Sequence, residues 1–134
     1  MVAKRESIEV VRARATELMS KMGIEDIKDR DIREVSGGQL QRAAICRAMI
    51  NSPEILFMDE PTGALNSEAA SQVMEILKKL NQEGISIMLV THDAKMASMA
   101  KKVIYIKDGK LAGEIKLSNE KEALAELDFW LKTI

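Results

Sequence analysis

Two short apolar segments with a helical segment between them restrict the fold of this chain more than any other feature. Residues 55–58 and 85–90 are strongly apolar, and each has the length of a β-strand. Such runs are typical of parallel strands that are buried on both faces. Between them, residues 67–80 carry apolar side chains at helical spacing. Strand, helix and strand in this order predict a β-α-β unit and an α/β fold.

The flanking sequence predicts further elements. Apolar spacing indicates helices over 7–22, 39–50, 94–100 and 120–131. Ser36 is a suitable N-cap for the second of these helices, and Gly23 lies where the first should end. Two further strands, over 103–106 and 111–117, flank Asp108-Gly109, which is a strong hairpin signal. We expect one compact unit without repeats or linkers.

Composition excludes several classes of protein. Twenty basic and 21 acidic residues leave a net charge of −1, so no general electrostatic attraction to nucleic acid is expected. No apolar run approaches the ~18 residues of a membrane span, and no secretory signal is visible at the start. The single Cys46 cannot form an internal disulfide, which fits a reducing compartment.

Polar residues that could bind a ligand or take part in catalysis follow the predicted strands and begin one of the predicted helices. Asp59 and Glu60 end the first strand, where an Asp can hold Mg²⁺ and a Glu can orient a water for attack on phosphorus; a solvated turn is the alternative. His92 follows the second strand and could contact a phosphate or have only a structural role. Residues 36–39 begin a helix and could offer N–H groups to phosphate, or form a flexible turn with an N-cap.

Four motifs in order give these residues a common interpretation. Val-Ser-Gly-Gly-Gln-Leu-Gln-Arg occupies 35–42, Asp-Glu-Pro-Thr follows the apolar run at 59–62, Gly-Ala-Leu-Asn occupies 63–66, and Val-Thr-His-Asp occupies 90–93. The set resembles the ATP-binding cassette (ABC) family across about residues 5–117. The Pro-Thr-Gly-Ala-Leu-Asn run is similar to the branch that serves lipoprotein release and antimicrobial-peptide export.

The resemblance implies a role for each matching residue. Asp59 would help to hold Mg²⁺, Glu60 would polarise the hydrolytic water, and His92 would contact the γ-phosphate of ATP. The family signature would act in trans on ATP bound to a second ABC domain, through Ser36, Gly37, Gly38 and Gln39. The D-loop, at the interface with that domain, would be Gly63, Ala64, Leu65 and Asn66. The family usually has Asp at the last of these positions, and Asn66 keeps its shape and hydrogen-bond acceptor but loses the charge.

The resemblance also implies a partial domain. The phosphate-binding loop G-x-x-x-x-G-K-[ST] is not found, because the glycines at 23, 37, 38, 63, 84, 109 and 113 do not fit it. We therefore expect the C-terminal half of a cassette: a partial P-loop NTPase (RecA-like) core that lacks the phosphate-loop strand. Residues 1–50 would be a helical-subdomain remnant with the signature helix, 51–117 half of the catalytic core, and 118–134 a C-terminal helix.

As an intact protein, such a cassette would be an ATPase that uses ATP and Mg²⁺ to drive transport. It would pair with a second ABC domain and a membrane permease, which would hold it at the cytoplasmic face of the cell membrane. The first helix would belong to the surface that meets the permease. Without the phosphate loop we expect no ATPase activity, and we expect self-association through the apolar edge of residues 85–90.

Two other functions stay open. One is a non-transport cassette of DNA repair or translation, although the long heptad segments of the repair type are missing here. The other is a non-enzymatic truncated cassette that supplies only its signature in trans.

Two arginines lie in the helix that follows the signature. Arg42 and Arg47 are expected to pair with carboxylates or water, and Arg42 is near enough the signature to approach a nucleotide.

Overall fold

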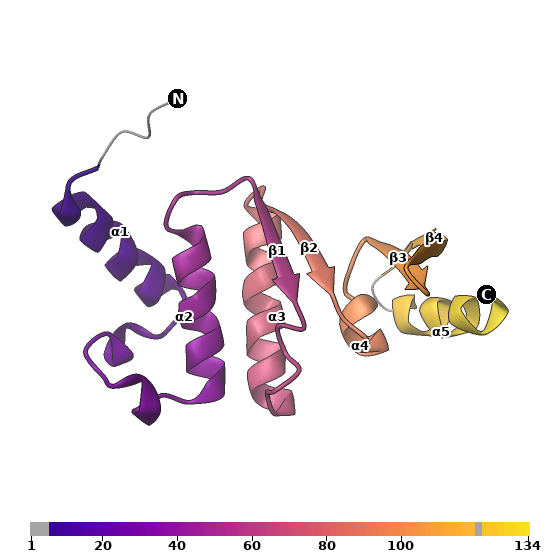
Figure 1. Cartoon of the computed structure of the whole chain (residues 1–134), viewed down its shortest axis with the longest axis horizontal. Coiled ribbons are helices and arrows are strands. Elements are labelled where there is room, and N and C mark those ends of the chain that lie inside the picture. The colour runs from indigo at the N-terminus through magenta and orange to yellow at the C-terminus, as the bar shows by residue number, and fades with distance from the viewer. Residues whose placement is uncertain (1–5, 120–121) are drawn as a thin grey trace. The chain divides into compact units, whose positions relative to one another are not determined.

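A computed structural model describes residues 6–119 and 122–134 and divides the chain into two compact units. The first unit spans Met1–Met88 and the second spans Leu89–Ile134. Helices and strands are interspersed along the chain, and α3 lies between β1 and β2 (Figure 1), which confirms the predicted α/β class. The finer division at residues 50 and 117 stays a prediction.

The first helix, α1, spans Ile8–Lys21 and has a specified end on each side. At its start, the Ser7 side chain caps the first turn. At its end, Gly23 adopts φ 65°, and the N–H of Ile24 donates to the carbonyl of Met19 at 2.9 Å. This C-cap depends on the left-handed conformation, which glycine adopts without strain. The predicted helix and its glycine stop are confirmed.

The second helix, α2, spans Gly37–Met49 and packs against α1 and the later helix α3. Its buried side chains include Ile45, Cys46 and Met49. Two short 3₁₀ helices connect α1 to α2, at Glu25–Ile27 and Ile32–Glu34. In the second 3₁₀ helix, the side chain of Ile32 is largely exposed. This part of the connection therefore contributes little to the core.

The predicted β-α-β unit is present. It consists of β1 (Ile55–Asp59), α3 (Ser67–Gln82) and β2 (Ser86–Val90), and the two strands pair directly. The N–H of Ser86 donates to the carbonyl of Glu54 at 2.9 Å, and both arrows run in the same direction in Figure 1. The apolar stripe of α3 forms much of the core, and complete burial of such a side chain stabilises the fold by about 1.5–3 kcal/mol. The buried residues of α3 are Ala70, Val73, Met74, Leu77 and Leu80.

The strands are not buried on both faces, and this prediction is wrong for the chain. Leu56 is buried, but its neighbours Ile55 and Phe57 are 43% and 70% exposed. On β2, Met88 and Val90 are 50% and 57% exposed. Successive strand residues point to opposite faces, so burying both faces requires a covering layer on each side. The described residues 6–119 and 122–134 bury the Leu56 side and leave the neighbouring side chains accessible.

The second unit contains the predicted hairpin. Strands β3 (Lys102–Lys107) and β4 (Lys110–Lys116) pair in antiparallel register. The two residues between them, Asp108 and Gly109, have φ values of 50° and 72°. Two consecutive left-handed residues match the twist of a hairpin, which is why Asp-Gly is favoured there.

Two helices complete the second unit: α4 (Ala94–Ala97) and α5 (Ala123–Thr133). The ring of Trp130 in α5 meets Tyr105 of β3 edge-on, with centroids 6.3 Å apart. A Cβ added to Gly113 would lie 2.8 Å from Cζ2 of Trp130, which is closer than packed atoms tolerate. Glycine at this position therefore allows the indole to lie against the hairpin. The predicted helix over 120–131 is found, although residues 120–121 lie outside the described part.

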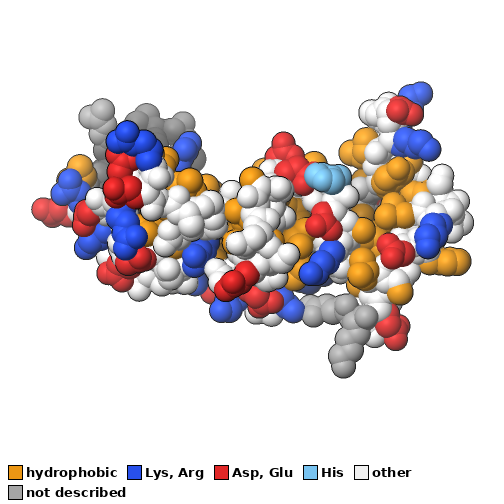
Figure 2. All heavy atoms as spheres, turned by 90° about the horizontal axis from the view of Figure 1, so that it is seen from below, with side chains coloured by type: hydrophobic (Ala, Val, Ile, Leu, Met, Phe, Trp, Pro, Cys, Tyr) orange, Lys and Arg blue, Asp and Glu red, His pale blue; other side chains and the backbone are white. Residues whose placement is uncertain are grey.

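Charged side chains of both signs are mixed over the face shown in Figure 2, with hydrophobic side chains among them. This mixture agrees with the near balance of 20 basic and 21 acidic residues in the whole chain. Across the described residues, none of the helices is long and apolar enough to cross a bilayer.

Candidate functional site

The signature turn, residues 36–39, forms the N-terminal end of α2. The N–H of Gln39 donates to Oγ of Ser36 at 3.2 Å, and the N–H of Ser36 donates to Oε1 of Gln39 at 3.1 Å. This reciprocal pair is a capping box, and it confirms Ser36 as the N-cap. The side chains that the resemblance assigns to nucleotide contact therefore also fix the shape of the turn. The positive end of the α2 dipole lies here, which favours an anion.

The two glycines of the signature turn allow close packing within the chain. A Cβ on Gly38 would lie 3.0 Å from Cβ of Ala69, in the first turn of α3. A Cβ on Gly37 would lie 3.3 Å from Cδ2 of Leu65, in the D-loop segment, residues 63–66. The backbone of the signature turn thus lies so close to α3 and the D-loop segment that an added Cβ would displace its neighbours by a few tenths of an ångström.

The carboxylate pair lies at the carboxyl end of β1. Asp59 is the last strand residue and is exposed, and the half-buried Glu60 follows it with φ 44°. A left-handed conformation is unfavourable for a residue with a side chain, and such strain persists where surrounding structure imposes it. The next turn supplies part of that structure, because the N–H of Gly63 donates to the carbonyl of Glu60 at 3.1 Å.

The last D-loop residue has a visible structural role. Oδ1 of Asn66 accepts a hydrogen bond from the N–H of Ala69 at 2.8 Å, so Asn66 is the N-cap of α3. Asn and Asp are comparably good N-caps. The replacement of the family's usual Asp therefore preserves the start of the helix while it removes a charge.

His92 belongs to the second unit, whereas the other predicted site residues belong to the first. It is exposed and follows β2. Its neighbour Asp93 caps α4 by accepting from the N–H of Lys95 at 2.8 Å, and the N–H of Asp93 donates to Oγ1 of Thr91 at 3.1 Å. The loop that carries His92 is therefore held by one hydrogen bond that spans His92 and by the Asp93 cap that follows it.

A groove of about 220 Å³ separates α2 from β1 and reaches Asp59. Its walls are mainly apolar, and Gln41 of α2 is the second polar residue in them. Sequence reasoning missed Gln41, since nothing in the spacing of positions 41 and 59 indicates that they line one groove. The lining residues are Gln41, Ala44, Ile45, Ala48, Leu56, Phe57, Met58, Asp59 and Pro61.

Comparison with known proteins decides the family. The chain is 40% identical to the ABC transporter ATP-binding protein YxdL of Bacillus subtilis (strain 168) over 127 residues, which make up 94% of this chain and 49% of YxdL. It is 46% identical over 110 residues to the macrolide export ATP-binding/permease protein MacB of Campylobacter jejuni subsp. jejuni serotype O:2, covering 82% of this chain and 17% of MacB. The chain belongs to the ABC transporter family.

Two further matches concern the fold of this cassette. The sequence pattern described as ABC transporter matches residues 2–63. The dimeric ATP-binding cassette MJ0796, solved in a post-hydrolysis state with ADP and Pi, superposes with a TM-score of 0.75 at 38% identity. That match covers 88% of this cassette and 52% of MJ0796. The predicted partial P-loop NTPase fold is confirmed, and the chain spans about half the length of YxdL and MJ0796.

Proposed function

We propose that this cassette is part of the ATPase subunit of an ABC transporter, and that the complete protein hydrolyses ATP to drive transport across a membrane. The observation that carries the proposal is the strained Glu60, held at φ 44° directly after Asp59 at the end of β1. Left-handed residues with side chains cost about 1–3 kcal/mol and cluster at functional sites. Unlike Asp108, whose left-handed conformation belongs to a hairpin turn, Glu60 lies at the carboxyl end of a parallel strand, where α/β sheets bind ligands.

In the proposed site, Asp59 helps to hold Mg²⁺, and Glu60 orients and polarises the attacking water. Mg²⁺ usually binds one or two carboxylates and takes its remaining ligands from water and phosphate oxygens. Within residues 6–119 and 122–134, no group of three or more His, Cys, Asp and Glu could hold a metal ion. The exposed Asp59 suits a site completed by ATP and water. His92 would contact the γ-phosphate.

The signature turn would act on ATP bound to a second ABC domain. Its capping box gives it a defined shape, its helix dipole favours phosphate, and Ser36 is exposed. The relative MJ0796 is described as dimeric and bound to ADP and Pi. The D-loop segment packs against Gly37 of the same chain and would meet the second domain beside the signature turn.

A membrane permease is the second proposed partner. MacB combines ATP-binding and permease functions in its name, and it is an exporter of macrolides. We propose that a permease subunit or domain holds this cassette at the cytoplasmic face of the cell membrane. The lipoprotein-release and peptide-export branch remains our proposal for the subfamily.

We also propose that the 134-residue chain alone neither binds nor hydrolyses ATP. Phosphoryl transfer depends on positioning and charge stabilisation, which the glycine-rich phosphate loop and its Lys supply in P-loop enzymes. No segment of this sequence matches that loop. A non-enzymatic cassette that supplies its signature turn to an intact partner is the alternative.

Calorimetric titration of Mg-ATP tests the proposal with two proteins. One is this chain, and the other is a completed cassette, in which the chain is joined to the part of YxdL that it does not match. We expect no binding to the chain and micromolar to millimolar binding to the completed cassette. In the completed cassette, Glu60→Gln should lower kcat at least about 100-fold while ATP still binds.

Three outcomes of this titration distinguish a transporter ATPase from a non-enzymatic cassette. Binding and turnover by the completed cassette that depend on Glu60 support a transporter ATPase. Binding without turnover, combined with stimulation of intact YxdL by the added chain, supports the non-enzymatic alternative. Binding of ATP by the chain alone would show that our account of the phosphate site is wrong.

A further inference from the structure

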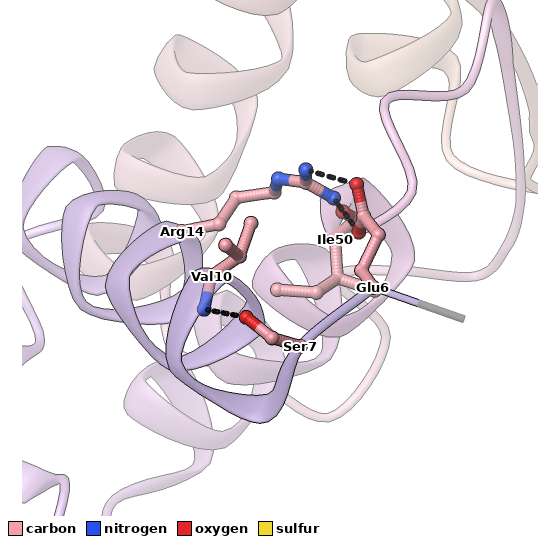
Figure 3. Close-up of polar contacts among 5 residues, drawn as sticks. All are labelled: Glu6, Ser7, Val10, Arg14 and Ile50. Atoms are coloured by element: carbon pink, nitrogen blue, oxygen red, sulfur yellow. Dashed lines mark hydrogen bonds and ion pairs between the residues drawn. The ribbon is translucent and has the colours of Figure 1, made fainter. Parts of the chain in front are cut away.

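Two arginines join α1 to α2, and each donates to the carbonyl end of the opposite helix. Arg14 of α1 donates through Nη1 to the carbonyl of Ile50, the C-cap of α2, at 2.8 Å (Figure 3). Arg42 of α2 donates through Nη1 to the carbonyl of Met22, the C-cap of α1, at 3.2 Å. The last carbonyls of a helix lack partners within it and carry the negative end of its dipole, so a cation there is stabilising.

The two arginines differ in their remaining partners. Arg14 forms two hydrogen bonds with the carboxylate of Glu6, at 2.9 and 3.0 Å, and this pairing lowers the pKa of Glu6 (Figure 3). Arg42 instead donates through Nε to the carbonyl of Gly38, at 3.4 Å, one turn earlier in its own helix. We predicted carboxylate or water partners for Arg42, and the structure gives two backbone carbonyls. One of these carbonyls belongs to the signature turn.

The guanidinium of Arg42 also contacts the turn that ends α1. A Cβ on Gly23 would lie 3.7 Å from Nη1 of Arg42, which is ordinary van der Waals contact. On the other side, Gly38 approaches Ala69 of α3 closely. The signature turn is therefore held between the C-terminal end of α1 and the N-terminal end of α3. The half-buried Arg42 provides the polar part of that support.

We propose that Arg42 is a positioning residue for the signature turn, which it fixes to the C-terminal end of α1 so that the helix and the turn move together. The planar guanidinium suits this task because its several donors have a fixed geometry, whereas the ammonium of Lys is a single point. The consequence for catalysis rests on the proposed function, in which the turn closes over ATP of a second domain. Movement of α1 would then be transmitted directly to the turn.

Amide hydrogen exchange of the 134-residue chain tests the link without ATP or a second domain. The variant is Arg42→Gln, and the control is Arg47→Gln, which removes the same charge from an exposed position of the same helix. In Arg42→Gln we expect exchange to rise about tenfold at residues 39–40 and 23–24, whose N–H groups are hydrogen-bonded, with α3 unchanged. Arg47→Gln should leave these rates within about twofold of the original.

Two results would overturn the proposal at this stage. One is equal behaviour of Arg42→Gln and Arg47→Gln; the other is a uniform rise over α1, α2 and α3, which indicates general destabilisation. If Arg42→Gln does not fold, Arg42→Lys takes its place. It keeps the charge and one donor, so a smaller local rise of about threefold is expected, and no rise contradicts the proposal.

Measurements of kcat and of the Kd for Mg-ATP on the completed cassette then distinguish a positioning role of Arg42 from a role in ATP binding. Arg42→Gln should lower kcat about tenfold while the Kd of the single cassette for Mg-ATP stays within about twofold, because the turn acts on the partner's nucleotide. A raised local exchange with unchanged kcat would also overturn the positioning role. Failure of the proposed function is distinguishable, since it appears as absent ATP binding in the protein with Arg42 intact.

Discussion

The signature turn and the β1–β2 sheet lie close in the sequence, but this chain supplies the packing of only one of them. The turn has its capping box, its arginine and its glycine contacts within residues 22–69. The sheet has two strands and leaves Phe57 70% exposed and Val90 57% exposed. Two paired strands alone are marginally stable in water, and a large uncovered apolar surface usually marks an interface.

The difference suggests which region depends on further polypeptide. Contacts of the signature turn come from α1 and α3, which are near in sequence and present in the chain. A strand that is apolar on both faces requires a second covering layer, which can come from a distant segment or another molecule. We therefore expect the turn to keep its shape in the isolated chain and the sheet to associate.

The largest expected effect concerns that association. Replacing Phe57 with Glu puts a charge on the uncovered face, and burial of a Phe contributes about 1.5–3 kcal/mol to an interface. Phe57→Glu should weaken self-association of the chain at least about tenfold by sedimentation velocity. Ile32→Glu is the matched control, because Ile32 is 69% exposed but lies outside the sheet. A wild-type chain that stays monomeric at high concentration, or an equal effect of the control, would contradict this prediction.

The next effect concerns the close approach of the signature turn to α3. Gly38→Ala adds a Cβ that would meet Cβ of Ala69 at 3.0 Å, so α3 must give by a few tenths of an ångström at this contact. We expect a loss of about 1–3 kcal/mol in the free energy of unfolding, measured with urea. Gly63→Ala, whose Cβ would meet its nearest atom at an ordinary 3.6 Å, should change stability by less than about 1 kcal/mol. The double change Gly38→Ala with Ala69→Gly should recover part of the loss, and no recovery would argue against this contact.

The smallest effect concerns the cap of α2. Ser36→Ala removes the acceptor for the N–H of Gln39 and should lower the free energy of unfolding by about 1 kcal/mol. Ser71→Ala is the control, because its hydroxyl donates to the carbonyl of Ser67 within α3 and caps no helix end. That change should stay within about 0.5 kcal/mol of the original. Equal losses in the two variants would show that the capping box does not stabilise the turn.

Much of the candidate site could be predicted because its signals are local. Ser36 and Gln39 are three residues apart, and their capping box follows from that spacing. The carboxylates Asp59 and Glu60 follow an apolar run that ends at the predicted place. The strain at Glu60, however, could not be foreseen, because a left-handed φ at Glu reflects the turn that follows and the packing around it.

The sequence by itself determined the order of the elements, both ends of α1 and the Asp108-Gly109 hairpin, since periodicity, caps and turn residues act over a few positions. The tertiary structure decided what those signals could not. It turned Arg42 toward backbone carbonyls, brought Gly38 against Ala69, and left one side of β1 uncovered. These features depend on which surfaces meet, and burial is settled only when elements distant in the sequence pack together.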